Sequence, residues 1–137
     1  MSKEVRAQSE DPPKPLFWIA SSRDDLREFP EVVKDAMGFA LYQAQLGSKH
    51  IDAKPLKGFG GAGVIEVVED FRGNTYRGVY TVKFAGAVYV LDAFQKKSKR
   101  GAKTPQGDID RIKRRLKVAE EHHQQWRLAQ QQKEEGK

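Results

Sequence analysis

The sequence contains no cysteine and only three histidines among its 137 residues. The absence of cysteine excludes disulfides, thiolate catalysis and cysteine-ligated zinc sites. None of the histidines (His50, His122 and His123) has a carboxylate or another histidine at ligand spacing around it, so we expect neither a metal site nor a cofactor. A nucleophile-elbow motif is also missing, which argues against catalysis by a serine triad.

Long apolar runs are absent too. No segment approaches the roughly 18 consecutive apolar residues that a membrane span needs. The first 14 residues, MSKEVRAQSEDPPK, are not followed by the apolar stretch of a secretory signal. We therefore expect a cytoplasmic protein with no membrane contact, and the length favours a single domain.

The positive charge is concentrated in one part of the chain. Residues 49–103 carry 11 basic and 5 acidic side chains, an excess of six that equals the formal net charge of the whole sequence, +6. A basic surface of this kind fits a polyanionic partner such as nucleic acid, but it also fits a merely solubilising surface. Charge alone leaves both interpretations open.

The hydrophobic pattern predicts one domain over residues 15–126, preceded by a flexible arm (1–14) and followed by a flexible tail (127–137). Apolar runs of strand length occur at residues 16–20, 65–71, 75–84 and 88–95. Helical spacing of apolar residues, with capping or proline signals, indicates helices at about 22–29, 30–46 and 105–126. The glycine- and lysine-rich segment 47–63 is expected to be a loop.

The resulting order is β-α-α-β-β-β-α, which is typical of an α+β fold. Three consecutive strands with short turns predict an antiparallel meander, so we expect a curved, largely antiparallel sheet. We expect the helices to cover one face and the basic residues to lie on the other, open face.

One reaction needs neither metal nor cysteine and suits the basic segment: cleavage of RNA by its own 2′-hydroxyl group. A base removes the hydroxyl proton, cations stabilise the pentacoordinate transition state and an acid protonates the leaving oxygen. The residues available for this chemistry are Lys54, Lys57, Arg77, Lys96, Lys97, Lys99 and Arg100, with Glu66, Tyr80, Asp92 and Phe94 nearby in sequence or pairing. Taken alone, these residues fit plain RNA binding or a solvated surface at least as well.

Four segments carry a family resemblance: Ala53-Lys54-Pro55-Leu56-Lys57-Gly58, Tyr76-Arg77-Gly78-Val79-Tyr80, Val90-Leu91-Asp92-Ala93-Phe94-Gln95-Lys96-Lys97-Ser98 and Thr104-Pro105. In this order and spacing they resemble the RelE/ParE toxin superfamily, and within it the HigB-like, phage-derived branch, over about residues 15–120. The resemblance implies a compact α+β toxin that cleaves mRNA on the ribosome. It also implies a cognate antitoxin, in this branch often a small helix-turn-helix protein.

The resemblance assigns roles to individual residues. It implies that Arg77 stabilises the transition state and that Lys57 or Lys54 acts as acid or base. It further implies that Lys96 and Lys97, at the basic end of the last strand, contact RNA. By residue type we add the cations Lys99 and Arg100 and the aromatic Phe94, which can stack on an unpaired base, as RNA contacts. Asp92 stands where many relatives carry histidine, so it is a further acid/base candidate, or else it forms a salt bridge to a neighbouring lysine. We expect the strand end around Asp92 to meet solvent.

Two other functions remain open at this stage. The chain could be a non-catalytic member of the same fold, either a gyrase inhibitor or an inert phage-derived binding module. It could also be a general RNA-binding module, whose affinity would fall with salt as counterions are released.

Overall fold

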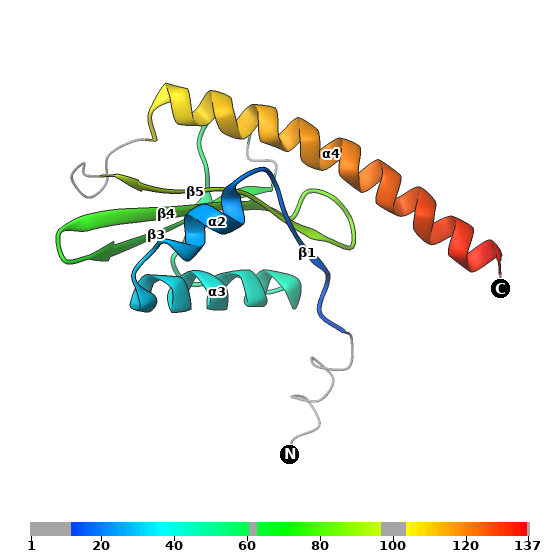
Figure 1. The fold of residues 1–137 in the computed structure, drawn as a ribbon, viewed down its shortest axis with the longest axis horizontal. Helices are drawn as coiled ribbons and strands as arrows, with labels where there is room; N and C mark the ends of the chain where they lie inside the picture. Colours follow the sequence, from blue (N-terminus) through cyan, green and yellow to red (C-terminus); the bar gives the residue numbers. More distant parts are fainter. Residues whose placement is uncertain (1–11, 61–62, 97–103, 137) are drawn as a thin grey trace, which may run out of the picture.

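The computed structural model of the protein describes residues 12–60, 63–96 and 104–136, and for Lys96 only the backbone. The chain forms a five-stranded sheet with helices on both sides (Figure 1). The strands are β1 (Leu16–Trp18), β2 (Ala53–Pro55), β3 (Val64–Phe71), β4 (Asn74–Thr81) and β5 (Val88–Lys96). The helices are α2 (Ser22–Arg27), α3 (Glu31–Gln45) and α4 (Gln106–Glu135). The predicted α+β class is confirmed.

The sheet has the order β1-β5-β4-β3-β2. Strands β3, β4 and β5 form the predicted antiparallel meander, while β1 pairs with β5 in parallel. The sequence analysis missed β2, which pairs antiparallel with β3 at the edge. This strand has three residues and includes Pro55, so it is too short to show the alternation by which strands are detected.

A two-residue turn fixes how β3 and β4 pair. Arg72 and Gly73 connect the strands with φ of 51° and 83°, and Phe71 pairs with Asn74 on either side. Positive φ at both central positions is the pattern of a type I′ turn, whose twist matches that of the strands. The resulting register places Arg77 opposite Val68 and therefore diagonally next to Glu66.

Apolar side chains line both faces of the central strands, and each face is covered by helix (Figure 1). On one face, Met37 and Leu41 of α3 pack with Tyr80 of β4 in a shared core. On the other face, Ile112 of α4 packs in a second core with Val79 of β4. The prediction that the helices share one face and leave the other open is therefore wrong. Because adjacent residues of β4 direct apolar side chains to opposite faces of the sheet, both faces must be shielded from water.

A β-bulge in β5 reverses which face of the sheet the side chains after the bulge point to. Val79 pairs with Asp92 and Tyr80 pairs with Val90, which leaves Leu91 without a partner across the β4–β5 ladder. Asp92 therefore faces α4. Without the bulge, simple alternation from Val90 would have directed the Asp92 side chain toward α3.

Helix α4 is longer than its core contacts require. Its buried residues are Ile109, Ile112 and Ala119, and the helix continues through residues 127–135, which the sequence analysis assigned to a flexible tail. That segment, RLAQQQKEE, contains only good helix formers, so it extends the helix without burying a face. Among the described helices, none has the length and apolar composition to cross a membrane.

The start of the described chain is tied to the end of α3. The backbone N–H of Lys14 donates to the carbonyl of Gln45 at 2.9 Å, and the Gln45 side-chain amide donates to the carbonyl of Lys14 at 2.7 Å. Residue 14 is thus held in place, whereas residues 1–11 of the predicted arm lie outside the described part of the chain.

Candidate functional site

A pocket of about 410 Å³ opens on the α4 face of the sheet. It is lined by β2 and the loop after it, by β3 and β4, and by the first half of α4: Lys54, Pro55, Leu56, Lys57, Gly58, Glu66, Val68, Arg77, Thr104, Gln106, Ile109 and Lys113. Three of the predicted site residues, Lys54, Lys57 and Arg77, are therefore brought to one place.

The exposed cations of the pocket come from two separate parts of the chain. Lys54 and Lys57 are exposed on β2 and the following loop, and Lys113 is exposed on α4. The ammonium group of Lys113 lies 5.8 Å from the centre of the Phe59 ring. The sequence analysis did not single out Lys113. Its position four residues after Ile109, a predicted core residue, is the signal that could have found it, because residues four apart share a helix face.

Glu66 and Arg77 form a buried ion pair in the pocket wall. Nη1 of Arg77 donates to Oε2 of Glu66 at 2.9 Å, and the two side chains are only 3% and 9% exposed. The hydroxyl group of Thr104 also donates to Oε2, at 3.4 Å. Both charged residues point to the α4 face because they are diagonal neighbours on β3 and β4. The pair places a carboxylate and a guanidinium in the wall of a cation-lined pocket.

Asp92 is held in a different network. It is 2% exposed, and it accepts bonds from Nε of Arg111 at 2.7 Å, from Nη1 of Arg115 at 3.0 Å and from the backbone N–H of Ala93 at 2.9 Å. The expectation that Asp92 meets solvent is wrong. Both carboxylate oxygens are engaged by α4 and the strand itself, and Asp92 is not among the residues that line the pocket. This geometry makes it a link between β5 and α4.

The remaining predicted RNA contacts follow Asp92. Phe94 lies directly opposite Arg77 in the β4–β5 pairing and is partly buried, with the Arg111 guanidinium 5.6 Å from its ring centre. The backbone of Lys96 pairs with that of Thr75. Lys97, Lys99 and Arg100 lie outside the described residues, so their predicted roles remain predictions.

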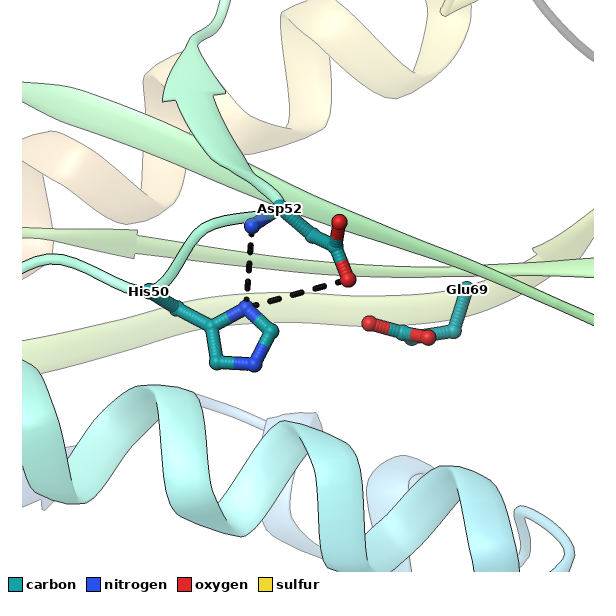
Figure 2. A group of neighbouring side chains, drawn as sticks. All are labelled: His50, Asp52 and Glu69. Carbon is teal, nitrogen blue, oxygen red and sulfur yellow. Dashed lines mark hydrogen bonds and ion pairs between the residues drawn. The ribbon is translucent and has the colours of Figure 1, made fainter.

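A second cluster of polar side chains lies on the α3 side of the sheet (Figure 2). Ligand atoms of His50, Asp52 and Glu69 all lie within 4.8 Å of one another. Nδ1 of His50 accepts the Asp52 backbone N–H at 3.0 Å and lies 3.9 Å from Oδ2 of Asp52. The sequence analysis saw no carboxylate placed to join His50. It missed this cluster because Glu69 arrives from β3, next to the start of β2, and only strand pairing brings the two together.

The carboxyl group of Glu69 is strongly perturbed. Burial is the main cause that raises the pKa of Glu69 from 4.5 to about 7, and a hydrogen bond with Asp52 and the negative charges of Asp52 and Asp70 raise this pKa further. Oε2 of Glu69 is buried and has no hydrogen-bond partner among the described residues. Two carboxylates thus sit side by side at the edge of the sheet.

These features define the protein as a small α+β domain. Its helices cover both faces of the sheet, and a cation-lined pocket lies near the edge strand β2. The chain belongs to the family of phage-derived Gp49-like proteins (DUF891), whose model matches residues 24–117. This range contains every residue that lines the pocket. The phage-derived branch named in the sequence analysis is thereby confirmed.

The chain also resembles a solved structure, the toxin–antitoxin complex RelBE2 from Mycobacterium tuberculosis. The identity is 21% and the TM-score is 0.42, and the alignment covers 63% of this chain and 94% of the other. No curated protein matches the sequence.

Proposed function

We propose that this protein is the toxin of a type II toxin–antitoxin system and that it inhibits translation by cutting mRNA on the ribosome. Membership in a family of phage-derived proteins supports this proposal. The observation that carries it is the convergence of Lys54, Lys57, Arg77 and Glu66 in one pocket. Such a set supplies a base, cations and a proton donor without a metal ion.

The pocket suits a short piece of single-stranded RNA. Its volume, about 410 Å³, falls in the range of about 300–1,000 Å³ typical of sites for small ligands. The exposed lysines on two sides of the opening are placed to meet phosphate groups, while the apolar side chains of Leu56 and Ile109 in the lining favour a base or sugar. A bound strand would thus have its backbone near the lysines.

In the proposed reaction, Glu66 accepts the proton of a ribose 2′-hydroxyl, and the oxygen attacks the adjacent phosphorus. The bond from phosphorus to the 5′-oxygen breaks, and that oxygen takes a proton from Lys57 or Lys54. The products are a 2′,3′-cyclic phosphate and a free 5′-hydroxyl. Arg77 holds the Glu66 carboxyl group in place and offers positive charge to the dianionic transition state.

The other predicted contacts extend this site. We retain Phe94, Lys96, Lys97, Lys99 and Arg100 as proposed RNA contacts beyond the pocket. Phe94 neighbours Arg77 across the strands, and Thr104, the first described residue after the basic segment, lines the pocket. Asp92 is no longer needed as acid or base, because Glu66 occupies the pocket and Asp92 is bound to two arginines.

The proposal also includes a partner and a compartment. A toxin of this kind needs a cognate antitoxin, which we propose to be a small helix-turn-helix protein. The ribosome as the place of action puts the protein in the cytoplasm.

Controlled expression tests the proposal. The wild-type chain should arrest bacterial growth, and mapping of transcript 5′ ends should show cuts inside translated codons. Replacing both Lys54 and Lys57 by Gln should reduce cleavage about 10²–10³-fold without unfolding the protein, because both side chains are exposed. Lys83→Gln is the matched control, since this exposed lysine lies outside the pocket.

The outcomes separate the candidate functions. Growth arrest with intact transcripts would overturn the nuclease proposal and favour a gyrase inhibitor. Absence of arrest, with binding of free RNA that weakens as salt rises, would favour a plain RNA-binding module. With purified components, cleavage that needs no ribosome would overturn the ribosome-dependent form of the proposal.

A further inference from the structure

We propose that His50, Asp52 and Glu69 form a binding site for one divalent transition-metal ion, with Zn²⁺ the preferred ion. The three side chains converge on one point at the edge of the sheet (Figure 2). They belong to the turn before β2 and to β3, on the side opposite the pocket. The proposal is independent of RNA cleavage.

The imidazole ring of His50 presents Nδ1 as an acceptor, the role that a metal ligand requires. Its Nδ1 accepts the N–H of Asp52, so this nitrogen carries a lone pair and no proton. The side chain is 11% exposed and its ring packs edge-on against Phe39 of α3, 5.7 Å between centres. The ring is therefore held with Nδ1 toward the two carboxylates, and metal binding exchanges one N–H contact for a coordinate bond.

Within the described part of the chain, the two carboxylates have no balancing lysine or arginine. Among the described residues, no lysine or arginine forms an ion pair with Asp52 or Glu69. Oε2 of Glu69 is also buried, and no residue in the described ranges forms a hydrogen bond with it. A buried carboxylate oxygen beside a second carboxylate costs free energy unless a cation or proton joins them. A divalent ion would satisfy both acids at once.

The ligand set and its size favour zinc. One imidazole nitrogen and two carboxylate oxygens make three protein ligands, and a water molecule completes a tetrahedron. The ligand atoms are now separated by up to 4.8 Å, which is more than the separation between ligands of a tetrahedral zinc ion. Small side-chain rotations must therefore bring the atoms closer together. Asp52 has this freedom because its side chain is 48% exposed. Nitrogen in the set disfavours Mg²⁺ and Ca²⁺, which prefer oxygen alone.

The consequence of binding would be structural. Asp52 immediately precedes the three-residue edge strand β2, and Glu69 lies in the neighbouring strand β3. A metal bridge between them would fasten β2 to the sheet. Lys54, which lines the pocket on the other face, is carried by this same short strand.

Zinc binding to the full chain tests the site directly. Protein treated with chelator and then titrated with ZnCl₂ in a calorimeter should bind one ion per chain, and its unfolding temperature should rise. Addition of Co²⁺ in place of zinc should give the visible absorption of a tetrahedral nitrogen–oxygen site. The proposal would be overturned if the calorimetric titration showed no end point at one zinc ion per chain. It would also be overturned if zinc did not raise the unfolding temperature.

Two substitutions separate binding from folding. Glu69→Gln and Asp52→Asn each remove a ligand charge and should weaken zinc binding at least tenfold. In the presence of chelator, the same variants should unfold at an equal or higher temperature than the wild type, because carboxylate repulsion is relieved. Asp70→Asn is the control: it removes a charge from the next residue of β3 and should retain zinc affinity within about twofold. Equal loss of affinity in the control would overturn the assignment.

Discussion

Glu66 and Glu69 lie three residues apart on β3, face opposite sides of the sheet and have opposite surroundings. Glu66 meets the guanidinium of Arg77 at 2.9 Å on the α4 side. Glu69 meets the carboxylate of Asp52 on the α3 side, and its pKa is raised to about 7. Glu66 thus has a cation as its nearest charged neighbour, whereas Glu69 has another acid.

This difference indicates what each face can do. The α4 face places a carboxyl group beside cations, an arrangement that suits proton abstraction next to a phosphate. The α3 face holds a proton or a metal between two acids. Substitutions that exchange or remove the partner of each glutamate test this comparison.

Removing the partner of Glu66 should have the largest effect. Arg77→Met leaves Glu66 buried with its carboxylate uncompensated, and we expect the free energy of unfolding to fall by about 3–5 kcal/mol. Urea denaturation followed by circular dichroism measures the loss. Arg114→Met, at an exposed position of α4, should change stability by less than about 0.5 kcal/mol. Similar losses in both variants would show that the ion pair does not matter to the fold.

A third buried carboxylate extends the comparison. Asp92→Asn should lower the free energy of unfolding by about 2–3 kcal/mol, because Arg111 and Arg115 lose their common partner. The loss is smaller than for Arg77→Met since these arginines are 31% and 15% exposed and regain water. Toxicity measured well below the unfolding temperature should persist. Complete loss of cleavage by a folded variant would instead restore Asp92 as acid or base.

The environment of Glu69 should appear as a pH dependence of stability. Its pKa is raised from 4.5 to about 7 on folding, so the folded state holds a proton that the unfolded state releases. This contribution is fully present below pH 4.5 and is lost as the pH rises to about 7. We expect a loss of about 1–2 kcal/mol in metal-free protein, after allowing for solvent screening.

Glu69→Gln isolates this contribution. The variant cannot ionise, so its stability should stay flatter than that of the wild type between pH 4.5 and 7, measured in chelator. Asp52 and Asp70 carry the charges that act on Glu69, so Asp52→Asn should reduce the slope as well. A wild-type curve parallel to that of Glu69→Gln would contradict the raised pKa.

Much of the fold could be predicted from local patterns. The meander and α3 follow from alternation and helical spacing, and Gly73 marks the turn between β3 and β4. The position of α4 was not predicted, because we expected one face of the sheet to be open to solvent. Strand β4 in fact carries apolar residues on both faces, such as Val79 and Tyr80. The strand β2 escaped notice because three residues carry no periodic signal.

The candidate site was predictable only in part. The basic residues Lys54, Lys57 and Arg77 stand out by type, and the structure brings them together. Glu66 was visible as a nearby acid, but its role depends on a diagonal pairing across strands that spacing along the chain does not reveal. The burial of Asp92 depends on a bulge, which shifts its facing by one residue and has no signature in the sequence.

The smallest expected effect concerns the two parts of α4. Trp126 packs 5.6 Å from the Phe17 ring, whereas Leu128 beyond it is 52% exposed. Removing residues 128–137 should therefore change the free energy of unfolding by no more than about 0.5 kcal/mol, while Trp126→Ala should cost about 1–3 kcal/mol. Thermal unfolding of the two variants gives the contrast. If the truncation lowers the free energy of unfolding as much as Trp126→Ala does, the exposed end of α4 also stabilises the domain. The stabilising part of the helix would then not end at Trp126.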